Sequence, residues 1–292
     1  MHTWFTERPV GGIRPGDHAW LPFATGEEQE HIVGTFVRDG LTTSEKVVYI
    51  GDGRPIELPG LRDLRRLDPN RYAETGQLRV IAREQACMTR GRLDPDQMLA
   101  TFEREISIAF DEGYRAVRIT TDLTWALCEP GGSDLMLSYE AQFEAAVGPS
   151  TRAMAICQIN RNSCAPDQLI ELEHTHEVLV AADPEFDDGT LRMTKTFDPY
   201  GLRLEGELDW PRHTVFAETL VSVTGTKRRV HLDFAGIRFV DLGSLEVLAV
   251  HATRLPRDHD LVLDNLPPEI EGVIEMVGWH RFPGVSRGRG MW

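Results

Sequence analysis

The sequence has few basic residues for its size. Its 31 lysines and arginines stand against 46 aspartates and glutamates, which leaves a formal net charge of −15 at pH 7. Binding to nucleic acid requires a concentrated basic surface. The basic cluster near the C-terminal end, SRGRG at Ser286–Gly290, is short. We therefore predict a protein that does not bind nucleic acid.

Long apolar runs are also missing. No segment is long and apolar enough to span a bilayer. The first residues, MHTWFTERPVGGIRPGDH, are polar and interrupted by proline and glycine, so they lack the apolar run of a secretory signal. These absences predict a cytoplasmic protein with no membrane association.

Cysteine is scarce, and the four cysteines do not form a dense framework: Cys87, Cys128, Cys157 and Cys164. In a cytoplasmic protein such residues are free thiols. Cys157 and Cys164, with His174 and His176, invite a zinc interpretation, but their spacings lack the usual tight pairs. Cys157 also lies in an apolar strand pattern, where cysteine acts as a small hydrophobic residue. We predict no metal site and no cofactor.

The first 182 residues alternate between strand-like and helix-like segments. Strands are predicted at Lys46–Asp52, Gly76–Ala82, Tyr114–Asp122 and Arg152–Asn160. A helix is predicted over Asp94–Gly113, because Asp94 suits the cap, Pro95 the first turn and Gly113 the end. A second helix follows at Ser133–Gly148. This alternation predicts an α/β fold with a mostly parallel sheet and flanking helices.

The acidic, turn-rich stretch at residues 183–190 is predicted to be a linker. It separates a first domain, residues 1–182, from a smaller α/β domain at residues 191–285, and residues 286–292 form a tail. In the second domain we predict strands at Leu202–Asp209, Arg229–Phe234 and Asp260–Leu266. Helices are expected at Pro211–Thr224, Ser244–Leu255 and Pro268–Val277.

The second domain resembles a STAS domain, the fold of anti-sigma factor antagonists. The matching features, in chain order, are Gly206–Asp209, Leu232–Phe234 with Gly236, Phe239–Asp241 before a helix, and a late Leu-Pro-Pro-Glu helix ending in Val277–Trp279. The resemblance implies a protein partner, either an anti-sigma factor or a kinase-like anti-sigma protein. In that family the strand–helix loop reads Asp-Ser-Ser-Gly-Leu, and the first serine is phosphorylated.

This chain departs from that pattern at the phosphorylated position. Aligning the loop on Asp241 and Leu245 places Leu242 where the phosphorylated serine stands, followed by Gly243 and Ser244. Leucine has no hydroxyl, so the usual switch is absent. We interpret Ser244 as the helix N-cap rather than a phosphorylation site. The segment Asp241, Leu242, Gly243, Ser244 and Leu245 is the predicted partner-binding edge, and Asp241 could alternatively serve only to satisfy the helix start.

The first domain resembles a MEDS domain, the methanogen and methylotroph sensory domain found in a dichloromethane-responsive regulator. The resemblance is carried by Gly16–Asp52, Gly76–Leu99, Gly113–Leu127, Tyr139–Val147, Ala155–Ile159 and His174–Val180. It implies a fold related to RecA/KaiC-type domains and the sensing of a small hydrocarbon derivative. No G-x-x-x-x-G-K-S/T loop occurs, so nucleotide hydrolysis is not expected.

The predicted ligand-binding residues are Asp17, His18, Asp52, Asp122, Trp125, Glu140 and His176. Asp52 and Asp122 end strands, and ligands of parallel sheets bind at the carboxyl ends of strands. Three of these residues have a structural alternative. Trp125 could be a core aromatic, His18 a hydrogen-bonded turn residue, and Glu140 a solvated or capping charge.

We therefore expect a signalling regulator that is not an enzyme. Its first domain would sense a small organic ligand, and its STAS domain would act as an anti-sigma factor antagonist; a homodimer is compatible with this role. One alternative is an oligomerising, stressosome-like scaffold. Another is an enzyme that acts on a small molecule through the segment Gly16-Asp17-His18, although no nucleophile–base spacing supports it.

Overall fold

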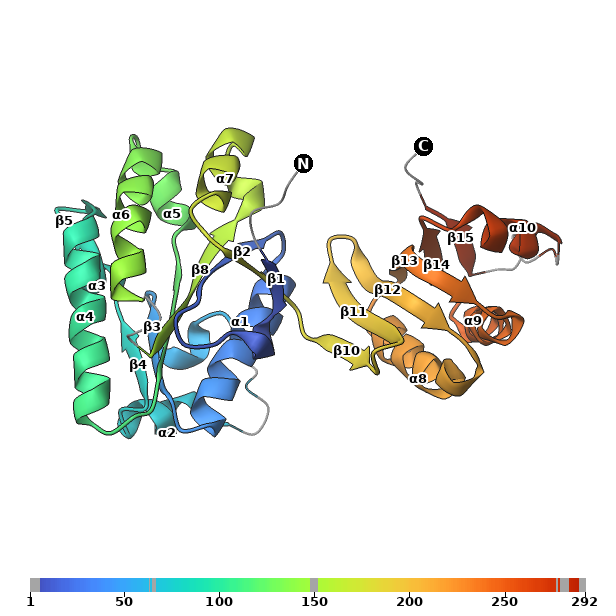
Figure 1. The fold of residues 1–292 in the computed structure, drawn as a ribbon, viewed down its shortest axis with the longest axis horizontal. Coiled ribbons are helices and arrows are strands. Elements are labelled where there is room, and N and C mark those ends of the chain that lie inside the picture. Colours follow the sequence, from blue (N-terminus) through green and yellow to red (C-terminus); the bar gives the residue numbers. More distant parts are fainter. Residues whose placement is uncertain are drawn as a thin grey trace. The chain divides into compact units, whose positions relative to one another are not determined.

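The structure is a computed structural model that describes residues 6–62, 64, 67–147, 152–276, 278 and 284–288, without the side chains of residues 141 and 144–146. The chain divides into two compact units, Met1–Ala181 and Ala182–Trp292 (Figure 1). In the part of the chain described, none of the helices combines the length and apolar character needed to cross a membrane.

The first unit is built on a seven-stranded sheet in which every pair of neighbouring strands is parallel. In spatial order the strands are β1 (Thr6–Pro9), β9 (Val178–Ala181), β2 (His18–Phe23), β8 (Ala153–Asn160), β7 (Val117–Asp122), β3 (Lys46–Ile50) and β4 (Leu78–Ile81). The four strands predicted from the sequence are present. β3 is buried along its whole length, as expected for a parallel sheet covered on both faces.

Helices cover both faces of this sheet. On one face, α4 (Pro95–Asp111), α6 (Gly132–Ala146) and α7 (Pro166–Glu173) pack in a single apolar core with alternate residues of the central strands, including Val117 and Ile119 of β7. On the opposite face lies α1 (Gly26–Thr42), whose Phe36 carbonyl accepts a hydrogen bond from Arg118 of β7. Alternation along β7 places Arg118 on this second face.

Shorter elements connect the main ones in this unit. They are η1 (Val10–Gly12), η2 (Pro55–Glu57), α2 (Pro69–Glu74), α3 (Arg83–Ala86), α5 (Thr124–Leu127), η3 (Arg161–Ser163) and the small hairpin β5 (Met88–Thr89) and β6 (Arg92–Leu93). The predicted start of α4 is confirmed, because the Asp94 side chain accepts a hydrogen bond from the backbone N–H of Gln97.

The second unit contains a six-stranded mixed sheet. Its order is β10 (Pro184–Asp187), β11 (Leu191–Phe197), β12 (Tyr200–Leu208), β13 (Arg229–Val240), β14 (Asp260–Asp264) and β15 (Val285–Arg287). The pairs β10–β11 and β11–β12 are antiparallel, and the others are parallel. η4 (Trp210–Arg212), α8 (His213–Thr224), α9 (Leu242–Arg254) and α10 (Pro268–Met276) complete the unit. Both units confirm the predicted α/β class.

Two boundaries in the second unit differ from the sequence prediction. The stretch 183–190, predicted as a linker, supplies β10, and Phe186 packs against the core of this unit. β13 runs six residues past its predicted end at Phe234, because its pairing with β12 continues through Gly236 and Phe239. Val277, Trp279 and residues 289–292 of the predicted tail lie outside the described residues.

Candidate functional site

Four metal-ligand-type side chains meet in the core of the first unit. His18 begins β2, Cys157 lies in β8, Glu140 lies on α6, and His176 lies in the turn between α7 and β9. β2 and β8 are paired with His18 opposite Ala155. Because side chains alternate across a strand, His18 and Cys157 project from the same face of the sheet. That face packs against α6, which brings Glu140 to them.

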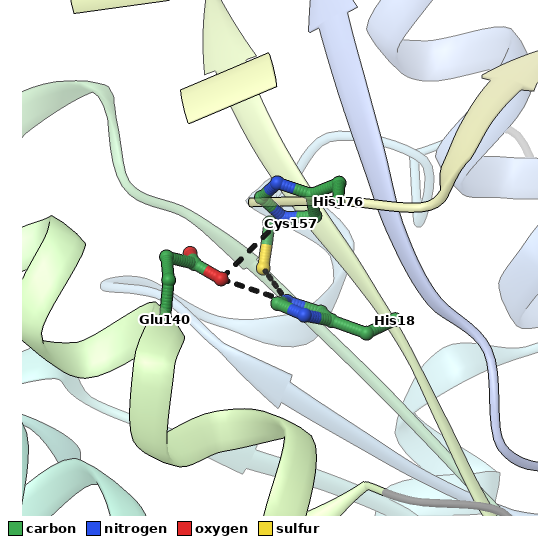
Figure 2. A group of neighbouring side chains, drawn as sticks. All are labelled: His18, Glu140, Cys157 and His176. Carbon is green, nitrogen blue, oxygen red and sulfur yellow. Dashed lines mark hydrogen bonds and ion pairs between the residues drawn. The ribbon is translucent and has the colours of Figure 1, made fainter. Parts of the chain in front are cut away.

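The donor atoms of this group converge (Figure 2). The Nε2 atom of His18 is 3.2 Å from the Cys157 Sγ and 3.2 Å from a carboxylate oxygen, Oε2, of Glu140. The Nε2 atom of His176 is 3.6 Å from the same Glu140 oxygen. One donor atom from each residue lies within 4.8 Å of every other. We call these four residues, His18, Glu140, Cys157 and His176, the buried group.

Burial favours the uncharged form of every member of the buried group. It raises the pKa of Glu140 to about 8 and lowers the pKa of His176 to about 4. Burial and the nearby charge of His176 lower the pKa of His18 well below its usual value. Burial and the charge of Glu140 raise the pKa of the Cys157 thiol well above its usual value. All four shifts therefore oppose charge on the side chain concerned.

The hydrogen bonding of the buried group is incomplete. Both carboxylate oxygens of Glu140 and the Nε2 atom of His176 are buried without a hydrogen-bond partner. The other ring nitrogen of His176, Nδ1, lies 2.9 Å from the Leu172 carbonyl oxygen and 3.0 Å from the Thr175 hydroxyl. A carbonyl can only accept, so Nδ1 carries the proton and Nε2 presents a lone pair to the buried group.

A separate pocket lies at the carboxyl ends of β3 and β7. It has a volume of about 390 Å³ and is lined by Tyr49, Ile50, Gly51, Asp52, Leu58, Pro59, Arg83, Asp122, Thr124 and Trp125. We call it the strand-end pocket. Parallel α/β sheets bind ligands at this edge.

The polar groups of the strand-end pocket are held by defined contacts. Asp52 accepts hydrogen bonds from the backbone N–H and the guanidinium of Arg83, at 2.9 and 2.5 Å. The same guanidinium lies over the Trp125 ring, 5.3 Å from its centroid. Asp122 accepts from the backbone N–H and hydroxyl of Thr124, at 2.9 and 2.6 Å. Charged groups and an aromatic face therefore share one small cavity.

The structure separates the seven predicted ligand-binding residues. His18, Glu140 and His176 belong to the buried group, whereas Asp52, Asp122 and Trp125 line the strand-end pocket. Asp17 lies in neither set. It accepts hydrogen bonds from the Arg8 side chain and, at 2.8 Å, from the Arg14 backbone N–H.

The structural alternatives considered for two of these residues are wrong. Glu140 is only 3% exposed, so it is not a solvated or capping charge. His18 opens a strand and faces the core rather than a turn. The zinc interpretation that the sequence invited included Cys157 and His176, but it combined them with Cys164 and His174, which are not members of the buried group, and it left out His18 and Glu140. Chain spacing could not reveal this group, because its members come from four separate elements.

The strand–helix loop of the second unit also differs from expectation. α9 begins at Leu242, and its N-cap is Asp241, whose side chain accepts from the Ser244 backbone N–H and hydroxyl, both at 2.7 Å. The interpretation of Ser244 as the N-cap is therefore wrong. Its hydroxyl also lies 3.0 Å from the Leu208 carbonyl and is buried. Aspartate and serine are about equally favoured as N-caps, and Asp241 precedes Ser244 in the chain, so the helix starts earlier than predicted.

Of the predicted partner-binding edge, only part reaches the surface. Leu242 is 64% exposed, whereas Ser244 and Leu245 are buried and cannot contact a partner directly. Asp241 lies 2.9 Å from His213 Nε2, and a Cβ on Gly243 would come within 2.4 Å of the His213 ring. Gly243 therefore has a packing role, and Asp241 and Leu242 form the accessible part of the edge.

Comparisons with known proteins match both units. A model of the MEDS family, described as the methanogen/methylotroph, DcmR sensory domain, matches residues 17–177. A model of a STAS family, described as Mlab, STAS domain, matches residues 191–285. A comparison with curated proteins finds no match.

Similar solved structures include three with low sequence identity. An anti-sigma factor antagonist from Mycobacterium paratuberculosis is 15% identical, with 35% of this chain and 81% of that chain covered and a TM-score of 0.28. A KaiC-like protein from Pyrococcus horikoshii is 19% identical, with 63% and 80% covered and a TM-score of 0.40. A flagellar accessory protein from Methanocaldococcus jannaschii is 12% identical, with 64% and 80% covered and a TM-score of 0.38.

The predicted order of domains is thereby confirmed. More than half of the chain lies within the first family match, and a STAS domain follows it. The chain belongs to the MEDS family of sensory domains.

Proposed function

We propose that this protein is a signalling regulator in which the MEDS domain binds a small organic molecule and the STAS domain binds an anti-sigma factor. The observation that carries the proposal is the strand-end pocket in a domain of a sensory family, in the same chain as a STAS domain. We propose no catalytic step for either unit.

The strand-end pocket has the size and lining of a small-molecule site. Its volume of about 390 Å³ falls near the lower end of the range for ligand pockets. Ile50, Leu58, Pro59 and the Trp125 ring supply apolar surface, and Asp122 supplies a hydrogen-bond acceptor. We infer a ligand with a short apolar part and one hydrogen-bond donor, such as a short-chain alcohol or amine.

A binding experiment tests the ligand part of the proposal. We expect at least one member of a panel of one- to four-carbon alcohols and amines to quench tryptophan fluorescence and raise the unfolding temperature. Trp125→Leu should weaken that binding at least about tenfold, because the ligand loses an aromatic wall. Trp210→Leu, in the second unit, is the control and should leave the affinity unchanged. Absence of binding by the whole panel, or equal binding by Trp125→Leu, would contradict this assignment.

Two exposed apolar side chains follow the ends of two neighbouring strands of the STAS domain. β12 and β13 are parallel, with Leu208 opposite Val240, so the segments that follow them leave the sheet at the same edge. Trp210, two residues after Leu208, is 78% exposed, and Leu242, two residues after Val240, is 64% exposed. Aromatic and apolar side chains in such a position are typical anchors of a protein interface.

The same edge supports a ligand-driven rather than a phosphate-driven switch. Leu242 stands where the STAS resemblance places the phosphorylated serine, and the Ser244 hydroxyl is buried in hydrogen bonds. The input would then come from the MEDS domain. A ligand changes partner binding only if it favours one state of the protein over another, so the partner affinity should differ between ligand-free and ligand-saturated protein.

A matched pair of variants tests the partner part of the proposal. We expect Leu242→Lys to weaken binding to an anti-sigma factor of the same genome by about tenfold or more, because a charge replaces an interface anchor. Met276→Lys is the control, since Met276 is 86% exposed at the end of α10. Isothermal titration with the purified anti-sigma factors measures both. If the two variants weaken binding equally, or no anti-sigma factor binds the parent protein, the partner assignment fails.

A further inference from the structure

We propose that the buried group, His18, Glu140, Cys157 and His176, binds one divalent transition-metal ion of the zinc class. This inference concerns a different part of the MEDS domain from the strand-end pocket and goes beyond the proposed function. Failure of either assignment would leave the other standing.

The spacing of the donor atoms agrees with tetrahedral coordination. Zinc binds nitrogen and oxygen at about 2.0–2.1 Å and sulfur at about 2.3 Å, which places neighbouring donors of a tetrahedron about 3.3–3.6 Å apart. The measured separations are 3.2 Å for His18 to Cys157, 3.2 Å for His18 to Glu140 and 3.6 Å for His176 to Glu140. These three separations are close to the edges of one coordination tetrahedron, and the two at 3.2 Å are slightly shorter than the expected edge. All remaining donor pairs lie within 4.8 Å, so closing the site requires only small side-chain movements.

Polar atoms without a hydrogen-bond partner point into the centre of the buried group. The Glu140 side chain has no exposed surface and the His176 side chain is 2% exposed, yet both Glu140 oxygens and His176 Nε2 have no hydrogen-bond partner. Buried polar groups are nearly always satisfied by protein, water or an ion. Figure 2 shows that the four side chains face one another rather than outward. A metal ion among them would satisfy Glu140 and His176 together.

A hydrogen bond from His176 Nδ1 orients the imidazole ring for metal binding. Its Nδ1–H donates to the Leu172 carbonyl at 2.9 Å, which fixes the ring orientation and leaves the Nε2 lone pair directed at Glu140. Metal-binding histidines commonly donate their second ring N–H to a carbonyl or carboxylate in this way. This contact is present on the side of the ring away from the buried group.

The charge and donor types select the class of ion. Two neutral imidazoles, one thiolate and one carboxylate would carry a total charge of −2, which a divalent ion neutralises in this buried position. Mixed nitrogen, sulfur and oxygen donors suit zinc and its neighbours such as cobalt, whereas magnesium and calcium prefer oxygen donors alone. With four protein donors the site is closed, as in structural zinc sites.

The test measures metal binding directly on the full chain. We expect metal-stripped protein to bind one equivalent of Zn²⁺ or Co²⁺ with a Kd below about 1 µM. Co²⁺ should give a visible tetrahedral spectrum with a near-ultraviolet thiolate-to-cobalt band. Cys157→Ser should lose that band and weaken Co²⁺ binding more than about a hundredfold, because even outer-shell changes cost 10–100-fold in metal affinity. Cys87→Ser is the matched control, because Cys87 is a buried cysteine outside the buried group.

Several outcomes would overturn the proposal. They are substoichiometric binding of both ions by the parent protein, a thiolate band retained in Cys157→Ser, or a band lost equally in Cys87→Ser. If Cys157→Ser does not fold, X-ray absorption of the zinc-loaded parent decides. One sulfur and three nitrogen or oxygen donors would support the site, and any shell without sulfur would refute it.

Discussion

Stripping the metal ion from the buried group is expected to lower the unfolding midpoint of the first unit by about 8–16 °C. An ion that binds only the folded state stabilises it by about 4 kcal/mol when its free concentration is a thousand times its Kd. In a unit of this size, 1 kcal/mol changes the midpoint by about 2–4 °C. The effect is large because the ion would join β2, α6, β8 and the turn before β9, which are distant in sequence.

Hydrogen exchange in the full chain locates this effect. Peptides from β2 and β8 should exchange faster after chelation, whereas peptides from β12, β13 and β14 in the second unit should not change. Glu140→Gln serves as the comparison, because it removes one donor and should make the midpoint nearly independent of added zinc. A midpoint of the parent protein that does not respond to zinc or chelator would count against metal stabilisation of this unit.

Replacing Arg118 by leucine is expected to reduce the free energy of unfolding of the first unit by about 3–5 kcal/mol. Arg118 and Glu45 are each 6% exposed, and the Arg118 Nε is 2.6 Å from a Glu45 carboxylate oxygen. The guanidinium also donates to the Phe36 carbonyl and lies over the Phe36 ring, 4.9 Å from its centroid. Leucine would leave a buried carboxylate without its main partner. Urea unfolding monitored by tryptophan fluorescence measures the loss.

Two further variants separate charge from packing at this pair. Arg115 also contacts Glu45, at 2.9 Å, but its side chain is 64% exposed, so Arg115→Leu should cost less than about 1 kcal/mol. The double variant Glu45→Leu/Arg118→Leu should recover much of the stability, because no unpaired charge remains in the core. Equal losses for Arg115→Leu and Arg118→Leu would show that burial does not set the strength of this pair.

Features of the fold that depend on neighbouring residues could be predicted from the sequence. The start of α4 follows from Asp94 and Pro95, and β3 follows from its run of β-branched and aromatic residues. In each case a few adjacent residues contain the physical cause. The order of the two domains was also predictable, because their motifs follow one another along the chain.

Features that depend on pairing with a distant strand were less predictable. β13 continues past Phe234 because β12 provides partners beyond that point, including Glu205 opposite Gly236. β10 exists because β11 turns back beside it. The start of α9 was misplaced for a different reason, since both Asp241 and Ser244 are good caps and only the observed hydrogen bonds distinguish them.

The sequence by itself determined the α/β class, the order of a MEDS and a STAS domain, and the candidate status of His18, Glu140 and His176. Only the tertiary structure decided that these three side chains meet one another and Cys157, and that Asp52, Asp122 and Trp125 belong to a different site. Local patterns report helix and strand formation because these depend on adjacent residues. A site assembled from β2, α6, β8 and a later turn depends on sheet register and helix packing, which bring together residues more than a hundred positions apart.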